Sequence, residues 1–135
     1  MVREGSCLCG KIRISFEGEP INKMLCHCLD CRKISGSAFS TNIVVPAAGF
    51  KILSGTPKTY VTDGDSGQEI TSYFCGDCGS TLWRNGKVTD FNPIVKAGVI
   101  DDSNFFVDNE AKPRVELFSH RRPRWVKEIP GAVQM

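Results

Sequence analysis

Short stretches in which apolar and polar residues alternate recur along most of the chain. Ile12, Ile14 and Phe16 occupy every second position, so a strand over 11–17 would place them on one face. Further short strands are predicted by similar patterns at 21–26, 39–45, 50–53, 58–61, 69–74, 80–84, 94–99 and 115–118. The chain is therefore expected to be mainly β.

Turn residues and two short helical patterns separate these strands. Ser-Gly-Thr-Pro at 54–57 lies between two predicted strands and favours a hairpin, and the polar, glycine-rich 62–68 favours a loop. One short helix is expected over 28–35, ending near Gly36, and a helical turn over 101–106. No long amphipathic helix is predicted.

Length and composition favour one soluble domain over 1–135. The chain has 135 residues, of which 41% are hydrophobic and 24% charged. No apolar run approaches the roughly 18 residues of a membrane-spanning helix, and the first residues do not resemble a secretory signal. We therefore expect no membrane partner and a reducing location, either the cytoplasm or, as an alternative, the nucleus.

Seven cysteines occur in short-spaced groups. The groups are Cys7 and Cys9, then Cys26, Cys28 and Cys31, then Cys75 and Cys78. Clustered cysteines in a reducing compartment are typical of metal sites, and an odd number excludes complete internal pairing. The sequence therefore predicts metal ligands rather than disulfides.

The first and last groups together are expected to form a closed, structural zinc site. Cys7 and Cys9 lie two positions apart and point to the same side of an extended segment, with Leu8 directed into the core. The turn between Cys75 and Cys78 contains glycine, and its backbone N–H groups can point at sulfur. Four thiolates complete a tetrahedron, as structural zinc sites require.

The middle group is expected to form a different kind of site. Cys26, Cys28 and Cys31 can occupy one face of an ion and leave one position for water or a substrate, as in catalytic zinc sites. His27 is expected to point away from the ion, because it lies between two residues that share a side. A fourth ligand, His27 or Asp30, would instead close the site and make it structural.

A rival division of the cysteines is also open. One four-cysteine site would use Cys28 and Cys31 with Cys75 and Cys78. The other three cysteines would then have no evident role, so we prefer the division into four and three.

The overall charge gives no indication of a nucleic-acid partner. The formal net charge is +2 with neutral cysteines, and binding of two Zn²⁺ ions by seven thiolates would make it about −1. The most basic stretch, 120–124, contains Pro123 and lies between Glu116 and Glu128. A solvated surface segment is expected there. Phe39, Phe74, Trp83 and Trp125 are expected to pack.

The three cysteine motifs resemble those of the glutathione-dependent formaldehyde-activating enzyme family, which shares its fold with centromere protein V. They are Cys-Leu-Cys-Gly-Lys at 7–11, Cys-His-Cys-Leu-Asp-Cys-Arg-Lys at 26–33 and Phe-Cys-Gly-Asp-Cys-Gly-Ser at 74–80, and the resemblance spans about 7–125. It implies a β-tent type fold of stacked antiparallel sheets with short helical turns, stabilised by zinc. It also implies two Zn²⁺ per chain, divided as above, and a carbon–sulfur lyase that joins formaldehyde to the thiol glutathione.

Positive side chains near Cys26, Cys28 and Cys31 would then influence how well the zinc centre accepts a glutathione thiolate. Three thiolates give a zinc centre a charge of −1, and a glutathione thiolate makes it −2, which weakens the ion as a Lewis acid. Arg32 and Lys33 follow the last ligand and are candidates to supply positive charge, and Arg32 can also hold a glutathione carboxylate in a fork. Ser35 and Ser37 are candidate hydrogen-bond donors to substrate.

The sequence is also compatible with two other functions. The chain can be an enzyme of the same fold that acts on another thiol or carbonyl compound. It can also be a binding module in which both zinc ions are structural. An open metal position favours an enzyme, because a scaffold does not need one.

Overall fold

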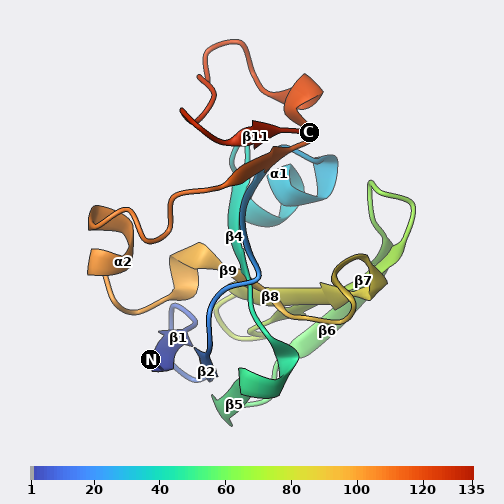
Figure 1. The fold of residues 1–135 in the computed structure, drawn as a ribbon. Coiled ribbons are helices and arrows are strands. Elements are labelled where there is room, and N and C mark those ends of the chain that lie inside the picture. The colour runs from blue at the N-terminus through green and yellow to red at the C-terminus, as the bar shows by residue number, and fades with distance from the viewer. Residues whose placement is uncertain (1) are drawn as a thin grey trace.

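The computed structural model describes residues 2–135, and these residues form mainly β structure, as predicted (Figure 1). The strands are β1 (Val2–Ser6), β2 (Arg13–Glu17), β3 (Asn22–Cys26), β4 (Ser40–Val44), β5 (Lys51–Ser54), β6 (Lys58–Asp63), β7 (Glu69–Phe74), β8 (Thr81–Gly86), β9 (Ile94–Lys96), β10 (Val115–Leu117) and β11 (Val133–Gln134). The short strands β1 and β11 were not predicted.

Two short α-helices interrupt the strands. They are α1 (Leu29–Ser35) and α2 (Asn104–Val107), and 3₁₀ turns lie at Ala47–Gly49, Lys87–Thr89, Ala97–Val99 and Ser119–Arg121. Cys28 caps the N-terminus of α1, and Gly36 ends the helix in the left-handed conformation, with φ of 64°. Glycine adopts this conformation without a Cβ clash. The prediction for this helix is confirmed.

Eight strands form one large sheet in the order β11-β10-β3-β4-β9-β8-β7-β6. Its pairs are antiparallel, except that β10 runs parallel to β3 and to β11. In the β3–β10 pair, Cys26 lies opposite Leu117. The C-terminal segment is thereby attached beside the middle cysteine group, at the end of the molecule where Figure 1 shows α1 and β11.

The main core lies between the large sheet and a three-stranded sheet of order β1-β2-β5. Ile12, Ile14 and Phe16 are all buried in it, as their alternation predicted. Trp83 from β8 is buried against the stacked ring of Tyr73, whose centroid is 4.5 Å away. Apolar burial of this kind supplies most of the folding free energy of such a chain.

The hairpin predicted around 54–57 is wrong. β5 pairs with β2 in the small sheet, whereas β6 pairs with β7 in the large sheet. Gly55 has φ of 80°, and a Cβ there would lie 2.6 Å from the Lys11 carbonyl oxygen. The turn residues thus direct the chain from β5 in the small sheet to β6 in the large one.

Two predictions of buried side chains are also wrong. Leu8 is 86% exposed and Trp125 is 79% exposed. Leu8 lies in a turn between β1 and β2 rather than in a strand, so the alternation of an extended segment does not apply to it. Trp125 follows β10 in a segment without regular structure.

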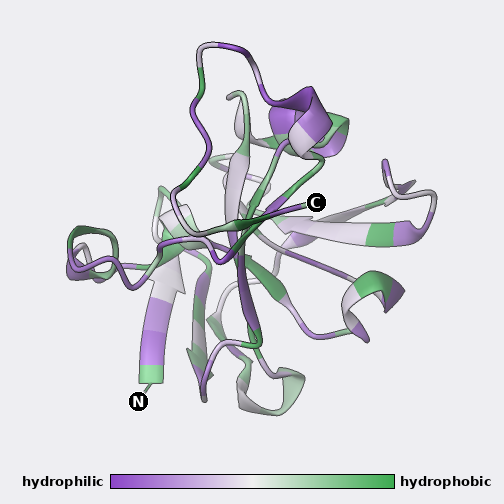
Figure 2. Cartoon of the chain, turned by 45° about the horizontal axis from the view of Figure 1, so that its top comes forward, coloured by the Kyte–Doolittle hydropathy of each residue, from purple (hydrophilic) through white to green (hydrophobic). Residues whose placement is uncertain are grey.

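Hydrophobic stretches are short throughout the described chain. Figure 2 shows hydrophilic and hydrophobic residues succeeding one another at short intervals along strands and loops. Among residues 2–135, no helix is long and apolar enough to cross a membrane.

Candidate metal centres

Four cysteines from two distant turns meet at the edge of the main core. Cys7 and Cys9 lie between β1 and β2, and Cys75 and Cys78 lie in the turn between β7 and β8. The Sγ atoms of Cys7 and Cys9 are 3.6 Å apart, and those of Cys9 and Cys75 are 3.7 Å apart. This cluster, called the four-cysteine cluster below, joins the small sheet to the large one.

The sulfur spacing of the four-cysteine cluster fits zinc. A tetrahedral ion with Zn–S bonds of about 2.3 Å requires sulfur atoms about 3.8 Å apart. The two distances above are close to this value, and all four sulfur atoms lie within 4.8 Å of one another. The cluster can therefore hold one zinc ion with a complete set of protein ligands.

Backbone and hydroxyl groups stabilise these sulfurs as thiolates. The N–H of Ile12 donates to Cys7 Sγ at 3.3 Å, and that of Asp77 donates to Cys75 Sγ at 3.4 Å. Hydrogen bonds from Ser80, chiefly its hydroxyl, lower the pKa of Cys78 to about 5. Thiolates are the form that binds metal.

Cys26, Cys28 and Cys31 form a second, separate group, the three-cysteine cluster. Cys26 ends β3, Cys28 caps α1, and Cys31 lies in the first turn of that helix. All three are buried, and their sulfur atoms lie within 4.8 Å of one another. The structure therefore divides the cysteines four and three, and the rival division does not occur.

No other His, Cys, Asp or Glu of residues 2–135 joins the three-cysteine cluster. His27 points away from it, and its Nε2 lies 2.9 Å from Glu116 Oε1. The Asp30 carboxylate instead accepts a hydrogen bond from Arg84 at 3.0 Å. The two side chains considered as closing ligands are thus engaged elsewhere.

The electrostatics of the three-cysteine cluster favour a bound cation. Hydrogen bonds from the Cys26 and Cys28 thiols lower the pKa of Cys31 to about 2. Interactions with Cys28 and Cys31, together with burial, raise the pKa of Cys26 far above its usual range. Three buried thiolates so close together are stable only with a positive ion between them. The donor set therefore fits zinc.

A cavity of about 100 Å³ adjoins the three-cysteine cluster. Its wall combines the three cysteines, a group of apolar side chains and a group of polar ones. The apolar residues are Ile70, Val88, Ile94, Leu117 and Phe118, and the polar ones are Asp30, Asn42, Asp65, Ser66, Arg84 and Lys96. The cluster thus faces space that a small molecule can enter.

Two buried cations line this cavity. Lys96 on β9 is 8% exposed, and its Nζ donates to Asn42 Oδ1 at 2.7 Å. Burial lowers the pKa of its ammonium, and the negative charge of Cys31 opposes this effect. Arg84 on β8 is 5% exposed and donates to Ser72 as well as to Asp30. Sequence reasoning missed both residues.

The loop between β6 and β7 lies along the cavity and contacts α1. Asp65 Oδ2 accepts from the backbone N–H of Leu29 at 3.2 Å. The same carboxylate forms an ion pair with Arg121 of the C-terminal segment. Gly64 and Ser66 also line the cavity. The predicted loop over 62–68 is therefore part of the site wall.

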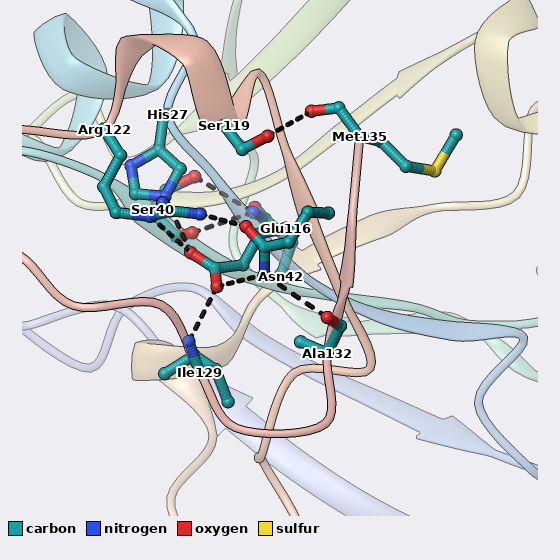
Figure 3. A network of polar contacts seen from close by, with 10 residues as sticks. His27, Ser40, Asn42, Glu116, Ser119, Arg122, Ile129, Ala132 and Met135 are labelled. Atoms are coloured by element: carbon teal, nitrogen blue, oxygen red, sulfur yellow. Dashed lines mark hydrogen bonds and ion pairs between the residues drawn. The ribbon is translucent and has the colours of Figure 1, made fainter.

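His27 and Glu116 form a buried network beside the three-cysteine cluster (Figure 3). Glu116 is fully buried rather than solvated, and it accepts hydrogen bonds from Arg122, the Ile129 backbone and Gln134. The basic stretch 120–124 is thus not simply a solvated surface segment, because it supplies partners to two buried or half-buried carboxylates.

The predicted substrate residues lie outside the cavity wall. Arg32 is exposed on α1, and Ser35 uses its hydroxyl to contact the Cys31 and Phe39 carbonyl oxygens, at 2.6 and 3.1 Å. Of the two buried cations that sequence reasoning missed, Lys96 was indicated by one feature of the sequence. Lys96 interrupts the apolar run Ile-Val-Lys-Ala at 94–97. A charge within a short buried strand requires a specific partner or ligand.

Comparisons with known proteins agree with this architecture. The model of the family described as glutathione-dependent formaldehyde-activating enzyme matches residues 2–121. A Halomonas elongata protein, named as a candidate enzyme of that kind, is 30% identical over 145 residues, covering 94% of this chain and 81% of its own length. A Sordaria macrospora protein with the same name is 29% identical over 85 residues. That match covers 63% of this chain and 34% of the relative, so the chain spans about a third of that protein.

A solved structure has a related fold. The crystal structure of a Rhodobacter sphaeroides protein aligns with a TM-score of 0.61 and 17% identity, covering 75% of this chain and 90% of that one. At this identity the likeness concerns the fold alone. The family match over most of the sequence, together with the cysteine clusters, shows that the chain belongs to the glutathione-dependent formaldehyde-activating enzyme family.

Proposed function

We propose that this protein joins glutathione to formaldehyde to give S-hydroxymethylglutathione, and that in the reverse direction it acts as a carbon–sulfur lyase. Family membership supports the choice of substrates. The observation that carries the proposal is the three-cysteine cluster, which faces a cavity and has no fourth ligand from residues 2–135. A metal position left open by the protein is the usual mark of a catalytic zinc site.

The protein would hold two zinc ions with distinct roles. The four-cysteine cluster would hold a structural ion, and Cys26, Cys28 and Cys31 would hold the functional one. Zinc bound at the three-cysteine cluster would supply a position at which an incoming thiol is kept as its thiolate. Free, clustered cysteines also support a reducing location, which we propose is the cytoplasm.

The chain's own side chains would position the reactants. The glutathione sulfur forms a bond to the carbonyl carbon, the C=O π bond breaks, and the thiol proton ends on the oxygen. The cavity of about 100 Å³ is too small to enclose the whole of glutathione, because pockets that enclose drug-sized ligands measure about 300–1,000 Å³, so only the thiol end and a small carbonyl compound would enter. The peptide arms would therefore extend outside, where the exposed Arg32 would hold a carboxylate, with Ser35 three positions further along α1.

Buried positive charges near the three-cysteine cluster would offset the negative charge that builds up when a glutathione thiolate joins the three cysteine thiolates. Lys96 and Arg84 bring two positive charges to the cavity wall, and Asp30 partly offsets that of Arg84. The exposed Arg32 and Lys33 are screened by solvent, so they act more weakly on the cluster. The buried pair is therefore the better candidate for stabilising a fourth thiolate, that of glutathione, beside the three cysteines.

Cobalt substitution tests the proposal directly. With Co²⁺ in both sites, glutathione should change the visible spectrum of one of the two ions, because a sulfur ligand enters the open position. Cys28→Ser should lower the metal content from two ions towards one and abolish the spectral change, while the chain stays folded by circular dichroism. An unchanged spectrum of the wild-type protein, or full turnover by Cys28→Ser, would contradict the proposal.

The apolar wall of the cavity favours a second candidate, in which the carbonyl compound is larger than formaldehyde. Leu117, Phe118 and Ile70 offer apolar surface that formaldehyde barely uses. The two candidates are distinguished by comparing kcat/KM for formaldehyde with kcat/KM for C2–C4 aldehydes at one fixed glutathione concentration. A higher value for the longer aldehydes would favour this candidate.

A further inference from the structure

Lys96 is a buried ammonium without a carboxylate partner among residues 2–135. Its Nζ has one acceptor in this part of the chain, Asn42 Oδ1. An ammonium has three N–H donors, so two remain unused. Burying a charge without full pairing is costly, and the cost is recovered when a ligand accepts the remaining hydrogen bonds.

The position of this ammonium is fixed by its neighbours. Asn42 donates from Nδ2 to Ser40 Oγ at 2.9 Å and to the Ser40 carbonyl at 3.3 Å, so its Oδ1 is oriented towards Lys96. Asn42 and Lys96 also lie opposite each other in the β4–β9 pair. A charge held in this way needs little reorganisation when a ligand arrives.

Lys96 and the three cysteine sulfurs line the same cavity. A carbonyl compound attacked by a sulfur atom at the cluster therefore has its oxygen within the same small space. That oxygen gains negative charge as the C–S bond forms, and a desolvated N–H donor aimed at it can stabilise the transition state by a factor of about 10² to 10³.

We propose that Lys96 donates a hydrogen bond to the oxygen of the carbonyl substrate and to the hydroxyl of the thiol adduct. This inference rests on the proposed function and assigns a catalytic residue to it. Arg84 is less suited to the role, because its Nε already binds Ser72 and one terminal nitrogen binds Asp30. Asp30 also neutralises much of its charge.

A simpler role must be separated from this one. In this simpler role, Lys96 balances the negative charge of the metal-loaded cysteines and does not contact the substrate oxygen. Loss of Lys96 would then weaken zinc binding at the three-cysteine cluster. This effect would be the same whether or not the ligand carries an oxygen. The test must therefore compare ligands with and without the oxygen.

Two stable ligands of equal size make this comparison. S-(2-hydroxyethyl)glutathione carries a hydroxyl near the sulfur, and S-propylglutathione carries a methyl in its place. Calorimetric titration of the zinc-loaded protein should show that the wild type binds the hydroxyl compound about tenfold more tightly, as expected for a hydrogen bond to a charged donor. Lys96→Met should lose this preference, and the exposed control Lys51→Met should keep it.

Activity and metal content complete the test. Lys96→Met should retain both zinc ions and lose about 10² or more in kcat/KM for adduct formation. If Lys96→Met does not fold, Lys96→Gln serves as the second variant, with the same expected direction. An unchanged preference for the hydroxyl compound in a folded Lys96 variant overturns the inference while leaving the proposed function intact, even if zinc is lost. Failure of wild-type protein to bind glutathione and both analogues overturns the proposed function and this inference together.

Discussion

Glu116 is a fully buried carboxylate whose hydrogen-bond partners come from four other residues near the site. Burial by itself would raise its pKa, but donors from His27, Gln134, the Ile129 backbone and Arg122 outweigh this effect and lower the pKa to about 2. A carboxylate whose pKa is lower in the folded state than in the unfolded one stabilises the fold above the unfolded pKa. This stabilisation is lost as the pH falls from about 4.5 towards 2.

Replacing Glu116 by Gln should therefore destabilise the protein in a pH-dependent way. At pH 7 we expect the free energy of unfolding to fall by about 2 kcal/mol, because the charged acceptor is lost. At pH 4 the loss should be about 1 kcal/mol smaller, since the unfolded wild-type carboxyl is by then largely protonated. Urea unfolding of both proteins at the two pH values measures this. An equal loss at both would contradict the assignment of the low pKa.

Residue spacing alone predicted how the cysteines group but not the charges around them. Cys26, Cys28 and Cys31 lie within six positions, so local geometry brings their sulfur atoms together whatever the rest of the fold does. Lys96 reaches the same cavity from a strand 65 positions after Cys31, through the pairing of β9 with β4. Such a contact depends on sheet order, which a single sequence does not reveal.

The loop between β6 and β7 ties three elements together at the cavity. Asp65 connects this loop to the first turn of α1 through Leu29 and to the 3₁₀ turn Ser119–Arg121 through Arg121. Each link is modest by itself, since partly exposed ion pairs and helix caps each contribute about 1 kcal/mol or less. Together they hold the loop against the helix that carries Cys31.

Asp65→Ala should loosen this wall without unfolding the protein. We expect the free energy of unfolding to fall by about 1 kcal/mol, and the amide protons at the start of α1 to exchange faster. Limited proteolysis should also cut the 64–68 loop sooner. Asp63→Ala is the matched control, because the exposed Asp63 side chain makes no hydrogen bond with the described residues. Equal exchange rates in the two variants would show that Asp65 does not secure the loop.

Most strands were predictable as elements, but their partners were not. Alternation places Ile12, Ile14 and Phe16 on one buried face whatever the neighbouring strand is. The choice between a hairpin and a crossing at 54–57 depends instead on the pairing of β5 with the distant β2, which brings Gly55 close to the Lys11 carbonyl. Turn composition is the same in both cases, so the sequence favoured the shorter connection.

The four-cysteine cluster connects the two sheets of the molecule. Cys7 and Cys9 follow β1 of the small sheet, and Cys75 and Cys78 follow β7 of the large sheet. Cys7 and Cys75 also belong to the main apolar core, so the sulfur atoms extend the packing between the sheets. The three-cysteine cluster, in contrast, gathers residues from a single stretch of chain, and its loss removes no link between the sheets.

The two clusters should therefore differ in what a bound metal ion would do for stability. Cys75→Ser should unfold the chain or lower its Tm by at least about 10 °C, because metal binding free energy at a closed site is also folding free energy. Cys28→Ser should lower the Tm by only a few degrees, although both changes remove one sulfur from a buried cysteine. Thermal unfolding followed by circular dichroism, with zinc content measured on the same samples, compares the two. A larger loss for Cys28→Ser than for Cys75→Ser would reverse the roles assigned to the clusters, since the site facing the cavity would then be the one that holds the fold together.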